Sequence, residues 1–275
     1  MTNTVLITGC STGFGKLAAE KFSNEGWNVI ATLRSPEKAP ELANLANTMV
    51  TKLDVTDAAS IKDAVSAGLK KFGTIDCLIN NAGYGGRAFF EQASVDSIDA
   101  MFATNVFGVM NVMREVLPHM RKNKSGSVIN VTSMAGMIGV PGNSVYSSSK
   151  WALEGLTEAM HLEYKQLGIK MHTVAPGAYV TTAFGANTDD FLDTGDAQIQ
   201  AASKKMRENF ERVVTSGDPQ DPADVSDLMF KLATEGGPVH NPVGADAQML
   251  AGLINGAADR EAFVQTAEQL LLPQD

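Results

Sequence analysis

The sequence predicts an α/β fold, a single domain built on a Rossmann-type, doubly wound parallel sheet of about seven strands with helices on both faces. Short runs rich in β-branched residues alternate with longer segments of helical periodicity. This alternation is typical of βαβ units, whose right-handed crossovers cover both faces of a parallel sheet. No repeat, low-complexity tract or composition shift divides residues 1–275.

The expected elements follow from that alternation. Strands are predicted at 5–8, 28–32, 49–53, 76–80, 127–132, 170–174 and near 242–245. Helices are predicted at about 14–25, 57–72, 96–122, 144–166 and 222–235, with two more after residue 247. The segment 181–217 breaks the rhythm and contains one helical stretch, 198–213. Because long excursions inside compact domains are usually functional, we expect a lid on the substrate side.

Composition excludes several classes of partner. The net charge of −9 and the absence of a long basic run argue against nucleic acid, whose phosphates need clustered Lys and Arg. No apolar run approaches the roughly 20 residues that span a bilayer, and the first strand begins too early for a signal peptide. Cys10 and Cys77 lie far apart without a metal-binding spacing. We expect a cytoplasmic protein with no metal and no membrane or nucleic-acid partner.

A glycine-rich turn, TGCSTGFG at residues 8–15, separates the first strand from the first helix. Gly9, Gly13 and Gly15 allow a tight turn and a close approach of the backbone to a pyrophosphate. The helix N-terminus that follows offers free N–H groups and the positive end of a dipole. An ordinary tight turn is the alternative, but the position inside a βαβ unit favours a dinucleotide site.

A second pattern carries proton-transfer chemistry. Tyr146 and Lys150 lie four residues apart on an expected helix and share one face. A free tyrosine has a pKa near ~10, and a neighbouring ammonium lowers that pKa towards the range useful for exchange with an alcohol. Such a pair is often only a solvated helix face. Ser133, at the end of a strand, favours catalysis, because reactive groups of open α/β sheets gather there.

Together these motifs resemble the short-chain dehydrogenase/reductase family over almost the whole chain. The glycine turn is similar to the family's Thr-Gly-x3-Gly-x-Gly cofactor motif. In sequence order, the further matches are Asn80-Asn81-Ala82-Gly83, Asn105, Ser133, Tyr146-x3-Lys150, Pro176-Gly177 and Thr181. Residues 242–247 are similar to the 17β-hydroxysteroid/retinol dehydrogenase-like subgroup.

The resemblance implies a role for each catalytic residue. Tyr146 exchanges a proton with the carbonyl or alcohol oxygen, and Ser133 hydrogen-bonds the same oxygen. Lys150 tunes Tyr146 and binds the nicotinamide ribose. Asn105 links Lys150 to solvent through a water, with a packing or capping amide as the alternative. The implied cofactor contacts are Gly9, Ser11, Gly13, Phe14, Gly15, Arg34, Asp54, Val55, Asn81, Ala82, Gly83, Tyr146, Lys150, Pro176, Gly177, Tyr179 and Thr181.

The end of the second strand decides the choice of dinucleotide. An acid there binds the ribose 2′-hydroxyl of NAD, whereas this chain has Arg34 and no carboxylate. An arginine fork suits a 2′-phosphate, which favours NADP(H) over NAD(H). A solvated loop arginine is the alternative reading. Asp54 resembles the family's adenine-contacting residue, or is an acid at a helix N-terminus.

The substrate is predicted from the residues around the proton donor. They are mainly apolar, which favours a neutral hydrophobic ketone or alcohol, although such Met and Phe residues are more often core. The predicted contacts are Tyr84, Ser133, Met137, Tyr146, Tyr179 and Phe184. An NADP(H)-dependent carbonyl reductase or secondary alcohol dehydrogenase is therefore expected. The alternatives are an NAD-dependent alcohol dehydrogenase and a non-catalytic dinucleotide sensor or scaffold. The resemblance also implies a homodimer or homotetramer formed through helices 96–122 and 144–166.

Overall fold

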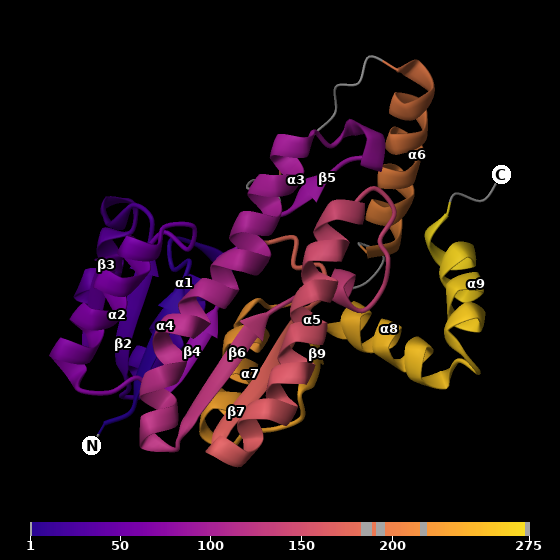
Figure 1. Cartoon of the computed structure of the whole chain (residues 1–275). Coiled ribbons are helices and arrows are strands. Elements are labelled where there is room, and N and C mark those ends of the chain that lie inside the picture. Colours follow the sequence, from indigo (N-terminus) through magenta and orange to yellow (C-terminus); the bar gives the residue numbers. More distant parts are fainter. Residues whose placement is uncertain (1, 183–188, 191–195, 215–218, 273–275) are drawn as a thin grey trace.

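A parallel sheet runs through the centre of the molecule (Figure 1). The computed structural model describes residues 2–182, 189–190, 196–214 and 219–272. Within them, the sheet has seven strands in the order β3-β2-β1-β4-β6-β7-β9. The strands are β1 (Thr4–Thr8), β2 (Asn28–Leu33), β3 (Thr48–Lys52), β4 (Cys77–Asn80), β6 (Gly126–Val131), β7 (Ile169–Pro176) and β9 (His240–Val243). The chain builds outward from β1 in one direction and then from β4 in the other, so the predicted doubly wound fold is confirmed.

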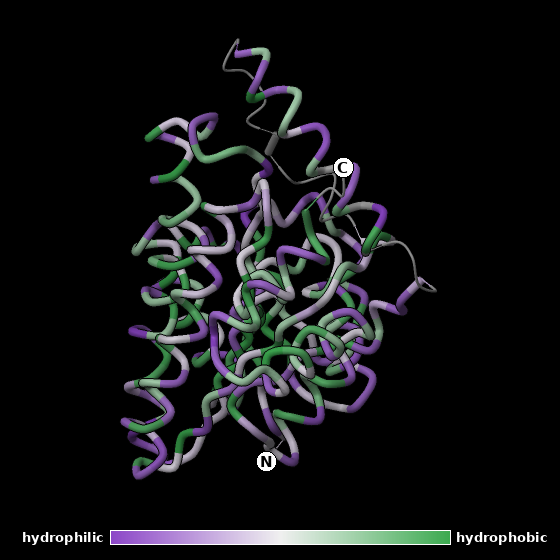
Figure 2. Tube along the Cα trace, turned by 90° about the vertical axis from the view of Figure 1, so that its right-hand side faces the viewer, coloured by the Kyte–Doolittle hydropathy of each residue, from purple (hydrophilic) through white to green (hydrophobic). Residues whose placement is uncertain are grey.

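Helices cover both faces of this sheet because its strands are apolar on both sides. In β1, Val5 and Ile7 belong to one hydrophobic core and Leu6 to the other. The first face is covered by α1 (Gly13–Asn24) and α7 (Ala223–Thr234). The second is covered by α2 (Ala58–Phe72), α4 (Gly108–Asn123) and α5 (Ser144–Tyr164). Figure 2 shows the resulting distribution, with hydrophobic residues mainly inside and hydrophilic ones on the outer turns.

A third hydrophobic cluster lies beyond the carboxyl ends of the strands. It joins Met101, Met134 and Tyr146 to Leu250 and Phe263 near the end of the chain. The elements here are α3 (Val95–Phe102), α6 (Ala197–Val214), α8 (Ala245–Gly256) and α9 (Arg260–Leu271). A two-stranded parallel sheet, β5 (Gly86–Arg87) with β8 (Asp189–Asp190), also forms here (Figure 1). This small sheet is absent from the sequence-based expectation, because two-residue strands carry no periodicity.

One predicted helix differs from the structure. The segment expected as a single helix over 96–122 consists of α3, the π-helical segment η4 (Ala103–Phe107) and α4. The remaining short helices are η1 (Pro36–Lys38), η2 (Pro40–Asn44), η3 (Phe90–Gln92), η5 (Met134–Gly136) and η6 (Lys165–Leu167). None of the helices in the described part of the chain has the length and apolar composition needed to cross a bilayer.

Candidate active site

A cleft of about 1480 Å³ lies at the carboxyl ends of the strands. Its walls come from the turns after β1, β2, β3, β4, β6 and β7, where open α/β sheets bind their ligands. Its volume exceeds the roughly 300–1,000 Å³ of an ordinary small-molecule pocket, so two ligands can lie side by side. The predicted residues that line it are Gly9, Ser11, Gly13, Phe14, Arg34, Asp54, Val55, Asn81, Ala82, Gly83, Tyr84, Ser133, Tyr146, Lys150, Pro176, Gly177 and Tyr179.

The turn after β1 needs its glycines for two different reasons. A Cβ on Gly15 would lie 2.3 Å from the carbonyl oxygen of Gly9, so the chain itself leaves no room for a side chain. Gly13 has a φ of +57°, but no atom lies within 4 Å of the position its Cβ would take. The backbone at Gly13 is thus open towards the cleft, which is what a bound phosphate requires.

Asn81 holds this turn in place from the end of β4. Its Nδ2 donates to the carbonyl oxygens of Thr8 and Gly9, each at 3.0 Å. The backbone N–H groups of Asn81 and Ala82 donate in turn to the Thr8 hydroxyl, also at 3.0 Å. The matched motif after the fourth strand therefore braces the glycine turn.

Basic and hydroxyl side chains gather where β2 ends. Arg34 is exposed and lines the cleft with Ser11, Ser35 and Lys38. Lys38 was not predicted, although a second basic residue one turn after Arg34 is the signal that identifies it. These side chains make this end of the cleft suited to an anionic group.

Asp54 takes part in a local turn next to this region. Its Oδ1 accepts from the N–H of Thr56 at 2.9 Å and from the Thr56 hydroxyl at 2.7 Å. Burial acts to raise the pKa of Asp54, but the Thr56 hydrogen bonds and the charges of Arg34 and Lys52 outweigh it and hold the pKa below its usual value. Asp57, rather than Asp54, caps α2.

Ser133 and Tyr146 meet in the cleft wall at the end of β6. The Ser133 Oγ accepts from the N–H of Ala135 at 3.1 Å, which orients the hydroxyl at the start of η5. Tyr146, in the first turn of α5, is only 8% exposed. Burial raises the pKa of Tyr146 to about 12, and its hydrogen bond with Ser133 opposes that rise. The phenol is therefore held in its protonated form at neutral pH.

Lys150 lies one helical turn further along α5 and is 5% exposed. Its Nζ donates to the carbonyl oxygen of Val131 at 2.9 Å and lies 5.7 Å from the centroid of the Tyr146 ring. Burial lowers the pKa of Lys150 to about 8, opposed by the charge of Glu154. The expected lowering of the Tyr146 pKa by Lys150 is not found in the chain itself. Burial dominates at Tyr146, and the ammonium is bonded to Val131.

Asn105 occupies the π-helical segment η4 and is fully buried. Its side chain accepts from the N–H of Tyr84 at 3.1 Å and donates to the Tyr84 carbonyl at 2.9 Å and the Ser149 Oγ at 3.2 Å. Its Oδ1 and the Lys150 Nζ both lie within 3.6 Å of where a Cβ on Gly83 would be. The packing role foreseen as an alternative is therefore present, and Asn105 also lies close to Lys150. Local π-helix at such a residue is common in functional sites.

A hydrogen-bonded network behind Lys150, which begins in the core at Glu154 and reaches the surface at His240, was not predicted from the sequence. Glu154 accepts hydrogen bonds from the hydroxyls of Thr132 and Thr173, the second at 2.9 Å. His240, in β9, contacts Glu154 through Nδ1 at 2.7 Å and Glu158 through Nε2 at 3.2 Å. The four-residue spacing from Lys150 to Glu154 was the available signal for Glu154. His240, in contrast, lies 86 residues from Glu154 in the sequence.

Four predicted contacts need separate comment. Thr181 is exposed and outside the cleft wall, whereas its neighbour Thr182 lines the cleft and donates to the Tyr179 carbonyl at 2.9 Å. Met137 packs in the third core cluster and is outside the cleft wall. Tyr179 lines the cleft, but its ring packs edge-on against Phe14 at 5.3 Å, on the side of the glycine turn rather than of Tyr146. Phe184 lies outside the described residues.

No group of three or more His, Cys, Asp or Glu side chains in residues 2–182, 189–190, 196–214 and 219–272 is arranged to hold a metal ion.

The fold and this site define the class of protein, and comparisons with known proteins agree. The family model for short chain dehydrogenases matches residues 3–193. The Bacillus subtilis (strain 168) protein called uncharacterized oxidoreductase YusZ is 40% identical over 248 residues, covering 84% of each chain. A crystal structure of a short-chain dehydrogenase from Streptomyces avermitilis has a TM-score of 0.80 and 31% identity, covering 98% of this chain and 96% of that one. The structure of ElxO with NADP bound has a TM-score of 0.75 and 28% identity, covering 90% and 100%.

The chain belongs to the short-chain dehydrogenase family. It is an oxidoreductase of that family, as the resemblance in the sequence indicated. The subgroup resemblance at residues 242–247 stays a prediction.

Proposed function

We propose that the chain is an NADP(H)-dependent carbonyl reductase or secondary alcohol dehydrogenase for a neutral, hydrophobic ketone or alcohol. The observation that carries this proposal is the convergence of Ser133, Tyr146 and Lys150 in one wall of a cleft whose other end is formed by the glycine turn and Arg34. These residues would hold a nicotinamide dinucleotide between the two ends, and such a cofactor would supply or accept the hydride at the reacting carbon.

The residues of the cleft fit a nicotinamide dinucleotide. The open backbone at Gly13 and the N-terminus of α1 would bind the pyrophosphate. Arg34 with Lys38 would bind a 2′-phosphate through charge-assisted hydrogen bonds. ElxO, which is 28% identical to this chain, has a structure with NADP bound, and this supports NADP(H) as the cofactor here. An NAD-dependent alcohol dehydrogenase is the alternative, and a cofactor comparison distinguishes them.

In the reductive direction, Tyr146 donates its phenolic proton to the carbonyl oxygen while Ser133 hydrogen-bonds the same oxygen. The raised pKa of Tyr146 keeps this proton on the phenol before the reaction. A Lys150 pKa of about 8 leaves the side chain mostly protonated at neutral pH, so a positive charge faces the phenolate that forms. Asn105 positions the Tyr84 backbone beside Lys150 and is proposed to take part in returning a proton from solvent.

The substrate class follows from the side chains around Tyr146. Tyr84, Met134 and Val140 line the cleft and pack in the same cluster as Tyr146. Ser203 and Phe210 of α6 complete this wall, which supports a lid role for the segment 181–217. A cytoplasmic location and assembly as a homodimer or homotetramer remain part of the proposal.

The experiment that tests this function is reduction of a panel of apolar ketones, followed by NADPH absorbance with NADH in parallel. Tyr146→Phe should lower turnover by about 10²- to 10⁴-fold and leave NADPH binding intact, because only the proton donor is lost. Tyr164→Phe is the matched control on the same helix, and its turnover should equal that of the unaltered chain.

The outcomes separate the alternatives. Faster turnover with NADH keeps the enzyme and reverses the cofactor assignment. Unchanged turnover in Tyr146→Phe contradicts the mechanism. Binding of both dinucleotides without turnover of any ketone would favour the non-catalytic sensor.

A further inference from the structure

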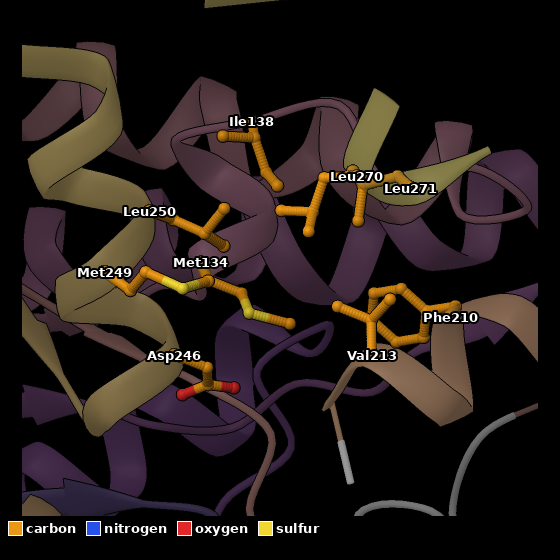
Figure 3. A pocket seen from close by; sticks show the side chains of 9 residues that line it. All are labelled: Met134, Ile138, Phe210, Val213, Asp246, Met249, Leu250, Leu270 and Leu271. Carbon is orange, nitrogen blue, oxygen red and sulfur yellow. The ribbon is translucent and has the colours of Figure 1, made fainter. Parts of the chain in front are cut away.

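A second, smaller cavity of about 30 Å³ lies beside the cleft. Figure 3 shows its walls, which come from the segment after β6, from α6, and from the two C-terminal helices α8 and α9. The lining residues are Met134, Ile138, Phe210, Val213, Asp246, Met249, Leu250, Leu270 and Leu271. This cavity will be called the tail cavity.

The surface of the tail cavity is almost entirely apolar. Asp246 stands at its edge with the carboxylate turned away from the apolar side chains (Figure 3). Its oxygens accept from the N–H of Ala178 at 2.7 Å, the Nε2 of Gln220 at 3.0 Å and the N–H of Ala247 at 2.8 Å. A hydrocarbon group therefore fits this cavity, whereas a polar group would lose its hydrogen bonds there.

Two side chains form a wall that the tail cavity and the cleft share. Met134 and Phe210 line both, and Met134 directly follows Ser133 in the chain. A methionine side chain is unbranched and adaptable, so it can move aside for a thin ligand. A substrate held at Ser133 and Tyr146 lies on one side of these two residues, with the tail cavity on the other.

We propose that the tail cavity receives the end of an unbranched alkyl chain, and that the substrates are elongated aliphatic ketones or the matching secondary alcohols. This inference rests on the proposed function, because it takes Ser133 and Tyr146 as the place of the reacting oxygen. A group the size of a water molecule needs about 10–15 Å³ of cavity volume, so roughly two or three carbons fit into the tail cavity. A rigid ring system is too wide for that space.

The test measures binding, so that it does not depend on turnover. A series of unbranched 2-ketones from butanone to tridecanone is titrated calorimetrically into the full chain with NADP⁺, which cannot reduce them. The dissociation constant should fall about fourfold for each methylene that becomes buried and then level off once the tail cavity is filled.

Two substitutions at Leu250, which lines the tail cavity but not the cleft, change its volume in opposite directions. Leu250→Phe should remove the last two or three increments, weakening the longest ketones roughly 15- to 60-fold and leaving the shortest unchanged. Leu250→Ala should move the plateau to longer chains. Leu232→Ala, at a buried leucine in α7 that lines neither the tail cavity nor the cleft, is the matched control and should keep the original length profile.

A dissociation constant independent of chain length would overturn the inference, as would length profiles that both Leu250 variants leave unaltered. If the profile behaves as described but no ketone is reduced with NADPH, the tail cavity stands and the proposed reaction fails. If short and long ketones are both reduced but bind with equal dissociation constants, the proposed reaction stands and the role of the tail cavity fails.

Discussion

At the scale of single residues, one face of α5 presents a stripe of four ionisable side chains. Tyr146, Lys150, Glu154 and Glu158 follow each other at four-residue intervals, so a phenol, an ammonium and two carboxylates share one helix face. The stripe begins in the cleft and ends at His240. Glu154 favours the charged form of Lys150 against the effect of burial, and we propose that it acts on Tyr146 through Lys150.

The pH dependence of stability should report on His240. Its hydrogen bond to Glu154 is the chief reason that its pKa lies above the usual value. A raised folded-state pKa stabilises the protein fully below the unfolded value, near ~6.5, and this stabilisation is lost as the pH rises through the folded pKa. The imidazole is 46% exposed and therefore screened, so the contribution is about 0.5 kcal/mol.

Urea unfolding at pH 6, 7 and 8 checks this expectation. The free energy of unfolding should decrease over this range more in the unaltered chain than in His240→Gln. Parallel pH profiles for the two proteins would show that the Glu154 contact does not stabilise the charged imidazole.

We propose that Arg34 decides between the two dinucleotides. Arg34→Asp should weaken NADPH binding by about 10- to 100-fold, the range of a lost charge-assisted hydrogen bond, and leave NADH binding nearly unchanged. Fluorescence titration with both cofactors measures the two effects. Arg114→Asp, on the exposed side of α4, carries the same charge change away from the cleft and should alter neither affinity. Equal losses for NADPH and NADH in Arg34→Asp would contradict the cofactor assignment.

At the scale of elements, the connection from β1 to α1 is a rigid piece rather than a free loop. The Asn81 side chain donates hydrogen bonds to two carbonyl oxygens of this connection, and Gly15 packs directly beneath them. The backbone that we propose to bind the dinucleotide is therefore already held by these contacts, which lowers the ordering cost of binding.

Gly15→Ala tests this element. Its Cβ would lie 2.3 Å from the Gly9 carbonyl oxygen and 2.4 Å from the Asn81 Nδ2, so the turn must open. We expect a loss of about 1–3 kcal/mol in the free energy of unfolding, together with weaker NADPH binding. Gly155→Ala is the control, since nothing lies within 4 Å of its Cβ and alanine favours the helix. A Gly15→Ala protein with unaltered stability and affinity would show that the turn is more adaptable than its packing indicates.

At the scale of the whole molecule, a monomer leaves two large apolar side chains in water, Phe107 in η4 and Leu162 in α5. Phe107 is 55% exposed and Leu162 is 73% exposed. We propose that both side chains lie in the interface of the homo-oligomer expected from the two long helical segments.

Leu162→Lys should therefore shift the assembly towards smaller species, because burying a lysine at an interface is unfavourable. Light scattering coupled to size-exclusion chromatography measures the mass directly. Leu253→Lys, a partly exposed leucine on α8, is the control and should leave the mass unchanged. A monomeric unaltered chain would contradict the assembly proposal, and equal masses for Leu162→Lys and the unaltered oligomer would move the interface elsewhere.

Much of the molecule was determined by the sequence alone. The seven strands of the sheet and, apart from the segment 96–122, the helices between them agree with the predicted ranges to within a few residues, because hydrophobic periodicity is a local property. The same holds for the arrangement of Ser133, Tyr146 and Lys150, since the first follows a strand and the others share a helix face. The glycine turn was identified because its backbone demands act within eight consecutive residues.

Only the tertiary structure decided how distant segments meet. The contact of His240 with Glu154, the pairing of β5 with β8, and the presence of both Met134 and Leu271 in the walls of the tail cavity bring together residues far apart in the chain. The π-helical turn at Asn105 and the burial that raises the Tyr146 pKa likewise depend on neighbours that no local pattern encodes. Periodicity specifies which face of an element is buried, whereas packing of those faces determines what lies against each side chain.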